Sequence, residues 1–194
     1  LNDAFINNVF LPLDNGRKPR FGDIIKKTKN NTKATINKLN FTLLGDPALS
    51  LYYPENKIIT TKINHKETEN YLELDTLKAL SIATIEAKIY DYEDNFLPNF
   101  NGKADIIVYD KSITMETLGN KSNIPYKYAH RPNIIFQGEV EVVNGNIKTE
   151  FMVPYDIRYN IDRGRISYYA VSEDYEQDAM GSFSNFMIGG FNPQ

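Results

Sequence analysis

Apolar residues in the first part of the chain recur at the spacing of amphipathic helices. One series consists of Leu1, Phe5, Ile6, Val9, Phe10 and Leu13, and a second of Phe21, Ile24, Ile25 and Thr28. This period predicts one helix in each stretch. Pro12 and the turn formers Asp14, Asn15 and Gly16 predict that the first helix ends near Leu11. In the second helix Asp23 precedes Lys26, Lys27 and Lys29, which is the order of charges that the helix dipole favours.

The pattern changes over residues 39–54, where a period of two begins. Leu39, Phe41 and Leu43 lie at alternate positions, which predicts a buried strand over residues 39–44. The next three residues, Gly-Asp-Pro, predict a tight turn, because glycine permits a positive φ and proline cannot donate to a ladder. Extended chain is expected from there to Pro54.

From Lys57 onward, apolar and polar residues alternate in the manner of strands with one face exposed to solvent. The strongest local signal is Asn144-Gly145, the preferred two-residue turn of a hairpin, inside residues 135–153. Further strands are predicted at residues 58–63, 72–74, 83–89, 104–108, 165–171 and 183–188. Residues 91–101 and 110–131 are expected to be loops, the second of them a long crossing loop.

Seven or eight short strands separated by turns predict a mainly β fold, an immunoglobulin-like antiparallel β-sandwich. We therefore divide the chain into a small α/β unit with two helices and one or two strands, residues 1–53, and a sandwich, residues 54–194. Helices of an α/β unit pack on a sheet, and the sequence offers only one strand of it, so we expect the rest to precede Leu1. On this interpretation the chain is part of a longer protein.

Composition limits the classes of function. The net charge of −3 and the pI near 5.5 argue against a nucleic-acid partner, because phosphate binding needs an excess of clustered Lys and Arg. Cysteine is absent, which excludes a disulfide, a thiolate metal site and a cysteine nucleophile within these 194 residues. The sequence also has no run of 18 apolar residues that would predict a membrane span.

The two histidines, His65 and His130, are candidate catalytic bases by residue type. They are 65 residues apart, and no recognisable nucleophile motif accompanies either. Nucleophilic catalysis needs a base and a nucleophile within hydrogen-bond distance, so the pattern favours surface histidines. We predict no catalytic residue, no cofactor-binding residue and no metal ligand in this chain.

Two acidic groups have the oxygen ligands that calcium prefers but lack the spacing of an EF-hand loop, which favours solvated loops. They are Asp91, Glu93, Asp94 and Asn95, and Glu173, Asp174, Glu176 and Asp178. A lysine group is interpreted as a solvated helix face in preference to an anion site. It consists of Lys26, Lys27, Lys29, Lys33 and Lys38.

Tyrosine is abundant and lends itself either to a ligand groove or to packing on half-buried strands, of which the pattern favours packing. The residues concerned are Tyr52, Tyr53, Tyr126, Tyr128, Tyr155, Tyr159, Tyr168 and Tyr169. The run Asp162-Arg163-Gly164-Arg165 predicts a turn with both arginines exposed.

Several segments, in this order and spacing, resemble the gingipain-type cysteine peptidases, and within them most closely the cell-surface sortase, or signal peptidase, of the bacterial type IX secretion system. Residues 37–54, with Leu-Leu-Gly-Asp-Pro-Ala-Leu-Ser-Leu-Tyr-Tyr-Pro, are similar to the closing strand of that family's caspase-like catalytic domain. The others are similar to the immunoglobulin-like domain that follows. They are Phe136-Gln137-Gly138, Val142-Val143-Asn144-Gly145, Phe151 to Ile157, Gly164 to Ala170, and Asp178-Ala179-Met180-Gly181.

The resemblance implies a parent enzyme that uses a His and Cys pair to remove C-terminal signals from exported proteins. In the family that pair precedes the Gly-Asp-Pro strand, so no catalytic residue carries over to this chain. The implied partners are the parent catalytic domain and its secreted substrates, and the implied location is the bacterial cell surface, outer membrane-associated or secreted. The apolar helical stripes further suggest self-association of the isolated chain.

Two other functions stay open at this stage. The sandwich is either a binding module that presents residues 91–101 and 110–131 to a protein or glycan, or a structural spacer. A His and a Cys at the ends of consecutive strands upstream of Leu1 would favour the enzyme, whereas a second sandwich there would favour binding.

Overall fold

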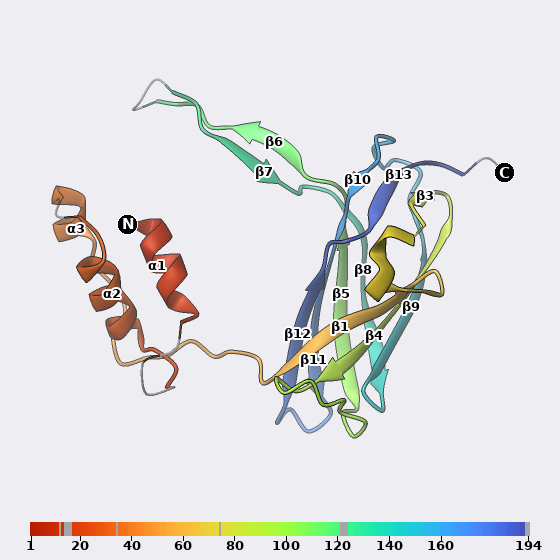
Figure 1. The fold of residues 1–194 in the computed structure, drawn as a ribbon, viewed down its shortest axis with the longest axis horizontal. Helices are drawn as coiled ribbons and strands as arrows, with labels where there is room; N and C mark the ends of the chain where they lie inside the picture. Colours follow the sequence, from red (N-terminus) through yellow and green to blue (C-terminus); the bar gives the residue numbers. More distant parts are fainter. Residues whose placement is uncertain (12, 14–16, 34, 74, 121–123, 193–194) are drawn as a thin grey trace. The chain divides into compact units, whose positions relative to one another are not determined.

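The computed structural model describes residues 1–11, 13, 17–33, 35–73, 75–120 and 124–192. The chain divides into two compact units, Leu1–Tyr53 and Pro54–Gln194, whose elements are labelled in Figure 1. We refer to them as the helical unit and the β unit.

The helical unit contains α1 (Asn2–Val9), α2 (Phe21–Asn30) and α3 (Ile36–Asn40). The two helices expected from the apolar stripes are confirmed, and Val9 and Ile24 supply their buried apolar side chains. Asn8 Nδ2 donates a hydrogen bond to the buried Thr28 Oγ1 at 3.4 Å, which joins α1 to α2. The expected stop signals at residues 12 and 14–16 lie outside the described residues.

The predicted buried strand over residues 39–44 is wrong. Leu39 lies in α3, and its side chain is 77% exposed, while Leu44 is 94% exposed. Thr35 caps this short helix by accepting a hydrogen bond from the Lys38 backbone N–H at 3.3 Å, a local signal that the six-residue alternation concealed. Phe41 is half-buried, with its ring edge-on to that of Phe5 at 6.0 Å.

The turn predicted at residues 45–47 is confirmed. Asp46 Oδ1 accepts a hydrogen bond from the Ala48 backbone N–H at 2.8 Å. The Pro47 carbonyl accepts one from the Gly22 N–H at 2.9 Å, which ties the turn to the start of α2. The β structure of the helical unit is limited, among its described residues, to the isolated bridge between Arg20 and Ser50.

The β unit is mainly β, as expected, and seven of its strands pair in a closed ring in the order β12, β11, β5, β8, β9, β4 and β1, with β1 returning to β12. Their bounds are β1 (Asn56–Ile63), β4 (Ile82–Tyr90), β5 (Gly102–Tyr109), β8 (Ile134–Val143), β9 (Asn146–Met152), β11 (Arg165–Ser172) and β12 (Asp178–Phe183). Strand β2 (Lys66–Glu67) extends the sheet beside β1.

The ring differs from the expected two separate sheets at two short joins. Strands β8 and β9 pair only through Val142 with Ile147 and Val143 with Asn146, beside the predicted Asn-Gly turn. Strands β1 and β12 pair in parallel over only Asn56–Ala179 and Lys57–Met180. The other pairings are long, so two layers, β12-β11-β5-β8 and β9-β4-β1, are joined at one end and separate toward the other.

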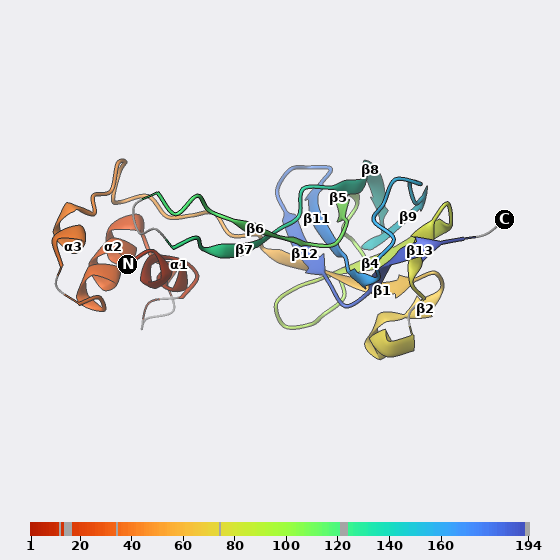
Figure 2. The ribbon, with the colours of Figure 1, turned by 90° about the horizontal axis from the view of Figure 1, so that it is seen from above.

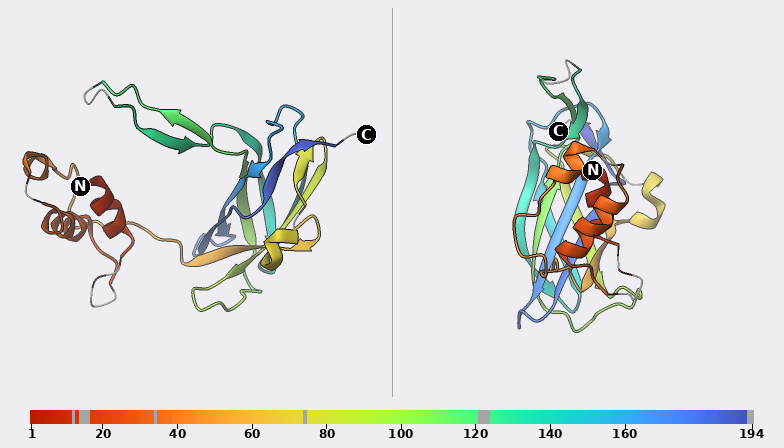
Figure 3. Two further views of the ribbon diagram at one scale, coloured as in Figure 1. Left: turned by 45° about the horizontal axis from the view of Figure 1, so that its top comes forward. Right: turned by 90° about the vertical axis from the view of Figure 1, so that its left-hand side faces the viewer.

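Three expectations along the β unit need correction. Leu72 lies in a 3-10 helix, Thr68–Glu73, whereas position 74 is outside the described residues. Residues 183–188 span the end of β12 and the start of β13 (Met187–Phe191). The expected loop 110–131 contains a hairpin of β6 (Ile113–Glu116) and β7 (Lys127–His130), which extends away from the ring in Figures 2 and 3 and is called the arm below.

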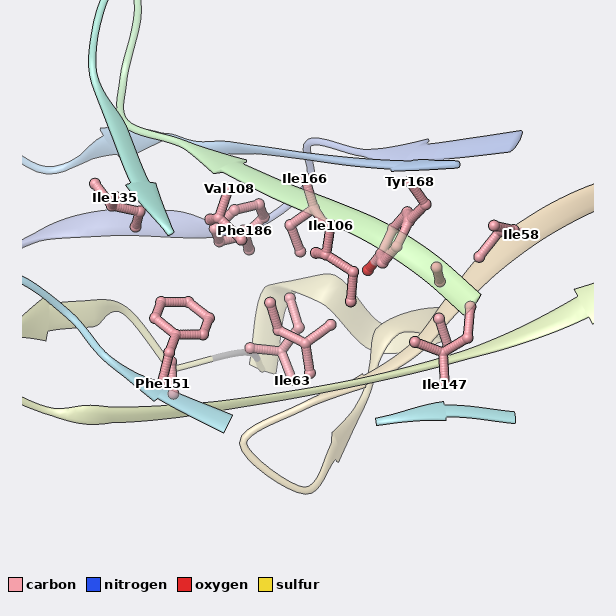
Figure 4. Close-up of a cluster of buried hydrophobic side chains, with 14 of the residues drawn as sticks. Ile58, Ile63, Ile106, Val108, Ile135, Ile147, Phe151, Ile166, Tyr168 and Phe186 are labelled. Atoms are coloured by element: carbon pink, nitrogen blue, oxygen red, sulfur yellow. The ribbon is translucent and has the colours of Figure 1, made fainter. Parts of the chain in front are cut away.

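A small second sheet lies beside the ring, in the order β10 (Asp162–Arg163), β13 and β3 (Leu77–Ala79). It contributes buried side chains, Leu77 and Ile188 among them, to the same core as the ring. Figure 4 shows that core as two facing rows of side chains, with Phe151, Ile63 and Ile147 opposite Ile106, Ile166 and Phe186. Tyr168 is buried among them, and its hydroxyl is 2.8 Å from Thr60 Oγ1.

Substitution of Gly181 in β12 tests whether the join between β1 and β12 stabilises the β unit. A Cβ at this position would lie 2.1 Å from the Ile58 carbonyl oxygen, so Gly181→Ala must push the two strands apart. We expect the free energy of unfolding to fall by about 2 kcal/mol or more. Urea denaturation measures it. Ser182→Ala, at the next and exposed position, should change the free energy of unfolding by less than about 0.5 kcal/mol. An equal loss in both variants would contradict the claim that the join between β1 and β12 stabilises the β unit.

Candidate functional site

The two histidines lie on separate surface elements. His65, with φ of +66°, follows Asn64, with φ of +49°, in the two-residue turn between β1 and β2. Positive φ at both positions is the signature of a type I′ hairpin turn, so His65 has a structural place in this turn that needs no catalytic role. His130 is exposed at the end of β7, opposite Ile113 in the arm. Among the described residues, neither ring makes a hydrogen bond or an ion pair.

The acidic residues of the loop after β4 are used within the loop. Asp91 Oδ1 accepts hydrogen bonds from the backbone N–H groups of Glu93 and Asn95 at 2.8 and 2.9 Å, and Oδ2 accepts one from Asn95 Nδ2. These hydrogen bonds, with Asn95 contributing most, hold the pKa of Asp91 below its ordinary value. Asp94 pairs with Lys57 Nζ at 2.6 Å. The carboxylates therefore order a turn.

The second acidic group is also tied to the backbone. Asp174 accepts hydrogen bonds from Ser172 Oγ at 2.5 Å and from the Glu176 N–H at 3.1 Å, and the Ser172 bond is the main cause of its lowered pKa. Asp178 is buried and accepts from the Glu55 N–H at 3.0 Å and the Tyr169 hydroxyl at 3.3 Å. Over the residues that the structure describes, no three His, Cys, Asp or Glu side chains are grouped to hold a metal ion.

The lysines and tyrosines are distributed over several surfaces. Lys26 and Lys33 are exposed, while Lys38 Nζ donates to the Thr32 carbonyl at 3.1 Å. Of the eight tyrosines, only Tyr168 is fully buried, and that burial raises the pKa of its hydroxyl. Tyr53 donates to the Val9 carbonyl. The exposed ones are Tyr52, Tyr126, Tyr128, Tyr155, Tyr159 and Tyr169, so packing accounts for fewer of them than expected.

The expected exposure of Arg163 and Arg165 is confirmed, although their surroundings are strands in place of a turn. Gly164, between them, is buried, and a Cβ there would lie 2.4 Å from Ile188 Cδ1. The glycine is therefore required by close packing against β13.

A buried ionic cluster at the base of the arm was not expected from the sequence. Asp110 and Lys111 follow β5, and their side chains are at most 1% exposed. Lys111 Nζ lies 2.8 Å from Asp110 Oδ1 and donates to the Arg158 carbonyl at 2.6 Å. Arg158 Nη2 donates in return to the Lys111 carbonyl at 2.5 Å, and its Nε lies 3.6 Å from Asp110 Oδ2. The cluster thus joins the arm to the segment before β10.

Electrostatics in this cluster favour the ionised carboxylate. Burial raises the pKa of Asp110, but hydrogen bonds from the side chain and backbone of Lys111, with the charges of Lys111 and Arg158, outweigh it, so the net pKa lies below its ordinary value. Each carboxylate oxygen faces one cation, Oδ1 the Lys111 ammonium and Oδ2 the Arg158 guanidinium. The sequence does indicate that Asp110 is buried, because residue 110 continues the alternation of the inward-facing positions 104, 106 and 108 of β5.

A hollow of about 670 Å³ lies on the outer surface of β5, β8 and β11, and we call it the outer groove. Its lining residues are Asn101, Gly102, Lys103, Asp105, Glu139, Glu141, Val142, Val143, Tyr169, Val171, Ser172, Glu173 and Tyr175. A neighbouring hollow of about 410 Å³ shares Asn101, Ser172 and Glu173 with it. The groove combines four carboxylates and one lysine with two tyrosine rings, a surface suited to binding and lacking a nucleophile paired with a base.

The described residues include no helix that is both long and apolar enough to cross a membrane.

Comparison with solved structures finds the dimeric latent form of PorU from Porphyromonas gingivalis, which shares 30% sequence identity with a TM-score of 0.64. The match covers 96% of this chain but only 18% of the PorU chain, so it spans a small part of that protein.

A second solved structure, Spo0M, a sporulation control protein from Bacillus subtilis, matches 71% of this chain and 51% of its own, at 7% identity and a TM-score of 0.41. No family model and no curated protein matches the chain.

The ionic cluster predicts a pH-dependent stability. Asp110→Asn leaves Lys111 buried without its counter-charge, so the free energy of unfolding near pH 7 should fall by about 3 kcal/mol. Because the pKa of folded Asp110 is lowered, its contribution is complete above the ordinary carboxyl pKa and is lost as the pH falls through the folded pKa. The difference between wild type and variant should therefore narrow below about pH 4. Urea denaturation across this range measures it.

The control for that experiment is Asp75→Asn, which removes an exposed carboxylate 2.9 Å from Lys66 Nζ. An exposed pair contributes at most about 1 kcal/mol, so this variant should remain close to wild type. A difference for Asp110→Asn that is small, or that persists unchanged in acid, would show that the Asp110 carboxylate does not compensate the buried charge of Lys111.

Proposed function

We propose that this chain is a non-catalytic part of a longer cysteine endopeptidase of the type IX secretion system, one that processes the C-terminal signals of secreted proteins. Residues 1–53 would be the end of its catalytic domain and residues 54–194 the immunoglobulin-like module that follows. The observation that carries the proposal is the similarity to PorU, which runs over 96% of the chain at 30% identity.

The similarity includes both units, and this supports a relation to PorU more than similarity over the β unit alone would. The absence of cysteine means that the nucleophile of such an enzyme must come from residues outside this sequence. The β unit follows the proposed end of the catalytic domain in the sequence and is built on a closed ring of strands around one core. We propose that it supports and positions that domain, at the bacterial cell surface or in secreted form.

The alternative is that the β unit is a binding module of a cell-surface protein. The outer groove and the arm favour this alternative, because both present side chains that the core does not use. The two roles are compatible within one protein, since the groove and the core lie on opposite faces of β5, β8 and β11.

The function is tested by comparing the 194-residue chain with the full-length protein from the parent reading frame. We expect the chain alone to cleave no peptide of a fluorogenic library, and the full-length protein to remove C-terminal signals. In the full-length protein, Gly181→Ala should lower the temperature of inactivation of cleavage together with that of unfolding, because the substitution weakens the β unit, which on this proposal contains no catalytic residue.

Ser182→Ala in the full-length protein is the matched control and should change neither temperature. Cleavage by the 194-residue chain that is lost in His65→Ala or His130→Ala would reveal a site in the chain itself. Full activity at temperatures at which the β unit has unfolded would contradict the supporting role, and a full-length protein without cleavage would contradict the enzyme.

We further propose that the helical unit of the isolated chain self-associates. Its exposed apolar side chains are Ile6, Phe10, Leu11, Ile36, Leu39, Leu44 and Leu49. Such a set is seldom left in contact with water on a monomer, and in the parent enzyme the catalytic domain would cover it.

Light scattering of the 194-residue chain beside a version that starts at Pro54 tests this. The longer chain should have the mass of a dimer or larger, whereas the β unit should remain monomeric. Two monomeric species, with no binding of a hydrophobic dye by the longer one, would contradict the proposal.

A further inference from the structure

The outer groove holds an unfavourable arrangement of charge. Asp105 on β5 lies directly opposite Glu139 on β8 in the antiparallel register, and Glu141 is the next residue along β8 on the same face. Like charges directly opposite each other on a sheet destabilise it. The groove nevertheless gathers them, and Glu173 adds a fourth carboxylate at its end.

One lysine offsets only part of this charge. Lys103 lies directly opposite Glu141 in the register, and its Nζ is 2.7 Å from Glu139 Oε1 on the diagonal. The hydrogen bond and charge of Glu139, with a smaller contribution from the charge of Glu141, raise the pKa of the lysine. Among the described residues, the carboxylates of Asp105, Glu141 and Glu173 make no ion pair and accept no hydrogen bond. The lining thus has an excess of three negative charges, four carboxylates against one lysine.

The walls of the groove are aromatic and apolar. Tyr169 is 41% exposed, Tyr175 is 85% exposed, and Val143 lies on the other side of the hollow with 53% of its surface exposed. Tyrosine faces attract the cations of Lys and Arg, and valines pack against the aliphatic stems of the same side chains. The negative charge of the groove and its aromatic and apolar walls therefore favour the same ligand, one that carries Lys or Arg side chains.

We propose that the outer groove binds an extended polypeptide segment that carries Lys or Arg at alternate positions. Glu139 and Glu141 are two residues apart on one strand, which separates them by about 6.8 Å. An extended ligand repeats its side chains on one face at the same distance, so two cations of a Lys-x-Lys segment meet both carboxylates. Asp105 supplies a second carboxylate beside the first cation, and Tyr169 and Tyr175 flank the segment.

The spacing also distinguishes a peptide from a metal ion. The carboxylates are distributed along and across the strands, and no three of them converge into a metal-binding group within the part of the chain that the structure describes. A cationic chain uses separate carboxylates one at a time, whereas calcium needs six to eight oxygen ligands around one point. The groove therefore fits a chain of separated cations.

The experiment measures binding of fluorescein-labelled decapeptides to the 194-residue chain by anisotropy, and locates it by amide chemical shifts. The probes are Lys-Gly repeats, Glu-Gly repeats, and a peptide of the same composition with its lysines in one block. We expect Lys-Gly repeats to bind most tightly, with shifts confined to β5, β8 and β11, and affinity to fall as salt is raised. Glu-Gly repeats should not bind.

Two charge-matched double variants decide whether the groove is responsible. Asp105→Asn with Glu141→Gln, which keeps the pair of Lys103 and Glu139, should weaken binding about tenfold, equivalent to about 1.4 kcal/mol. Glu69→Gln with Glu93→Gln removes the same charge at exposed positions elsewhere and should change it less than about twofold. Circular dichroism confirms that both variants remain folded.

Four results would overturn the proposal. They are no binding of Lys-Gly repeats, equal weakening by both double variants, chemical shifts outside the groove, and displacement of the peptide by millimolar calcium that produces the same shifts. Absence of binding excludes a cationic ligand. Equal weakening by both double variants would assign the binding to overall charge, and shifts outside the groove would assign it to another surface. Displacement by calcium with the same shifts identifies a metal site.

Discussion

The β unit depends on how closely β12 approaches β1. Two pairs of residues join these strands in parallel, and the approach is possible because Gly181 has no side chain to meet the Ile58 carbonyl. With the Asn144-Gly145 hairpin, this contact joins the two layers at one end. At the other end the layers separate, and large side chains such as Phe151 and Phe186 fill the space between them. At the joined end, the distance between the two layers is therefore fixed by two short backbone contacts.

A buried ionic cluster holds the base of the arm and the segment before β10, which the apolar core does not include. Asp110, Lys111 and Arg158 are joined by ion pairs and reciprocal hydrogen bonds to backbone carbonyls. Burying these charges costs solvation, which the pairing must offset, so the loss of one member is expected to cost more stability than the intact cluster adds. The fold thus combines an apolar core, which tolerates small changes of shape, with an ionic cluster that requires all three of its side chains.

The sequence predicts strands well where alternation is long and a turn residue marks its end. Residues 83–89 and the hairpin around Asn144-Gly145 have both signals, and β4, β8 and β9 follow them. Residues 39–44 show that six alternating positions do not outweigh a capped helical turn at Thr35. Strands β6 and β7 have no buried face, so no hydrophobic period could reveal them. The outer groove depends on which strands become neighbours, which no local pattern specifies.

The closed base of the arm has a consequence for how this protein varies. The backbone N–H of Asp110 donates to the Asn133 carbonyl at 2.9 Å, and this bond holds the two ends of the arm together whatever lies between them. The entropy of closing a loop grows only slowly with its length once the ends are fixed. Shortening, lengthening or replacing the segment between these two residues is therefore expected to cost little stability, and the same position is suited to the grafting of foreign sequence.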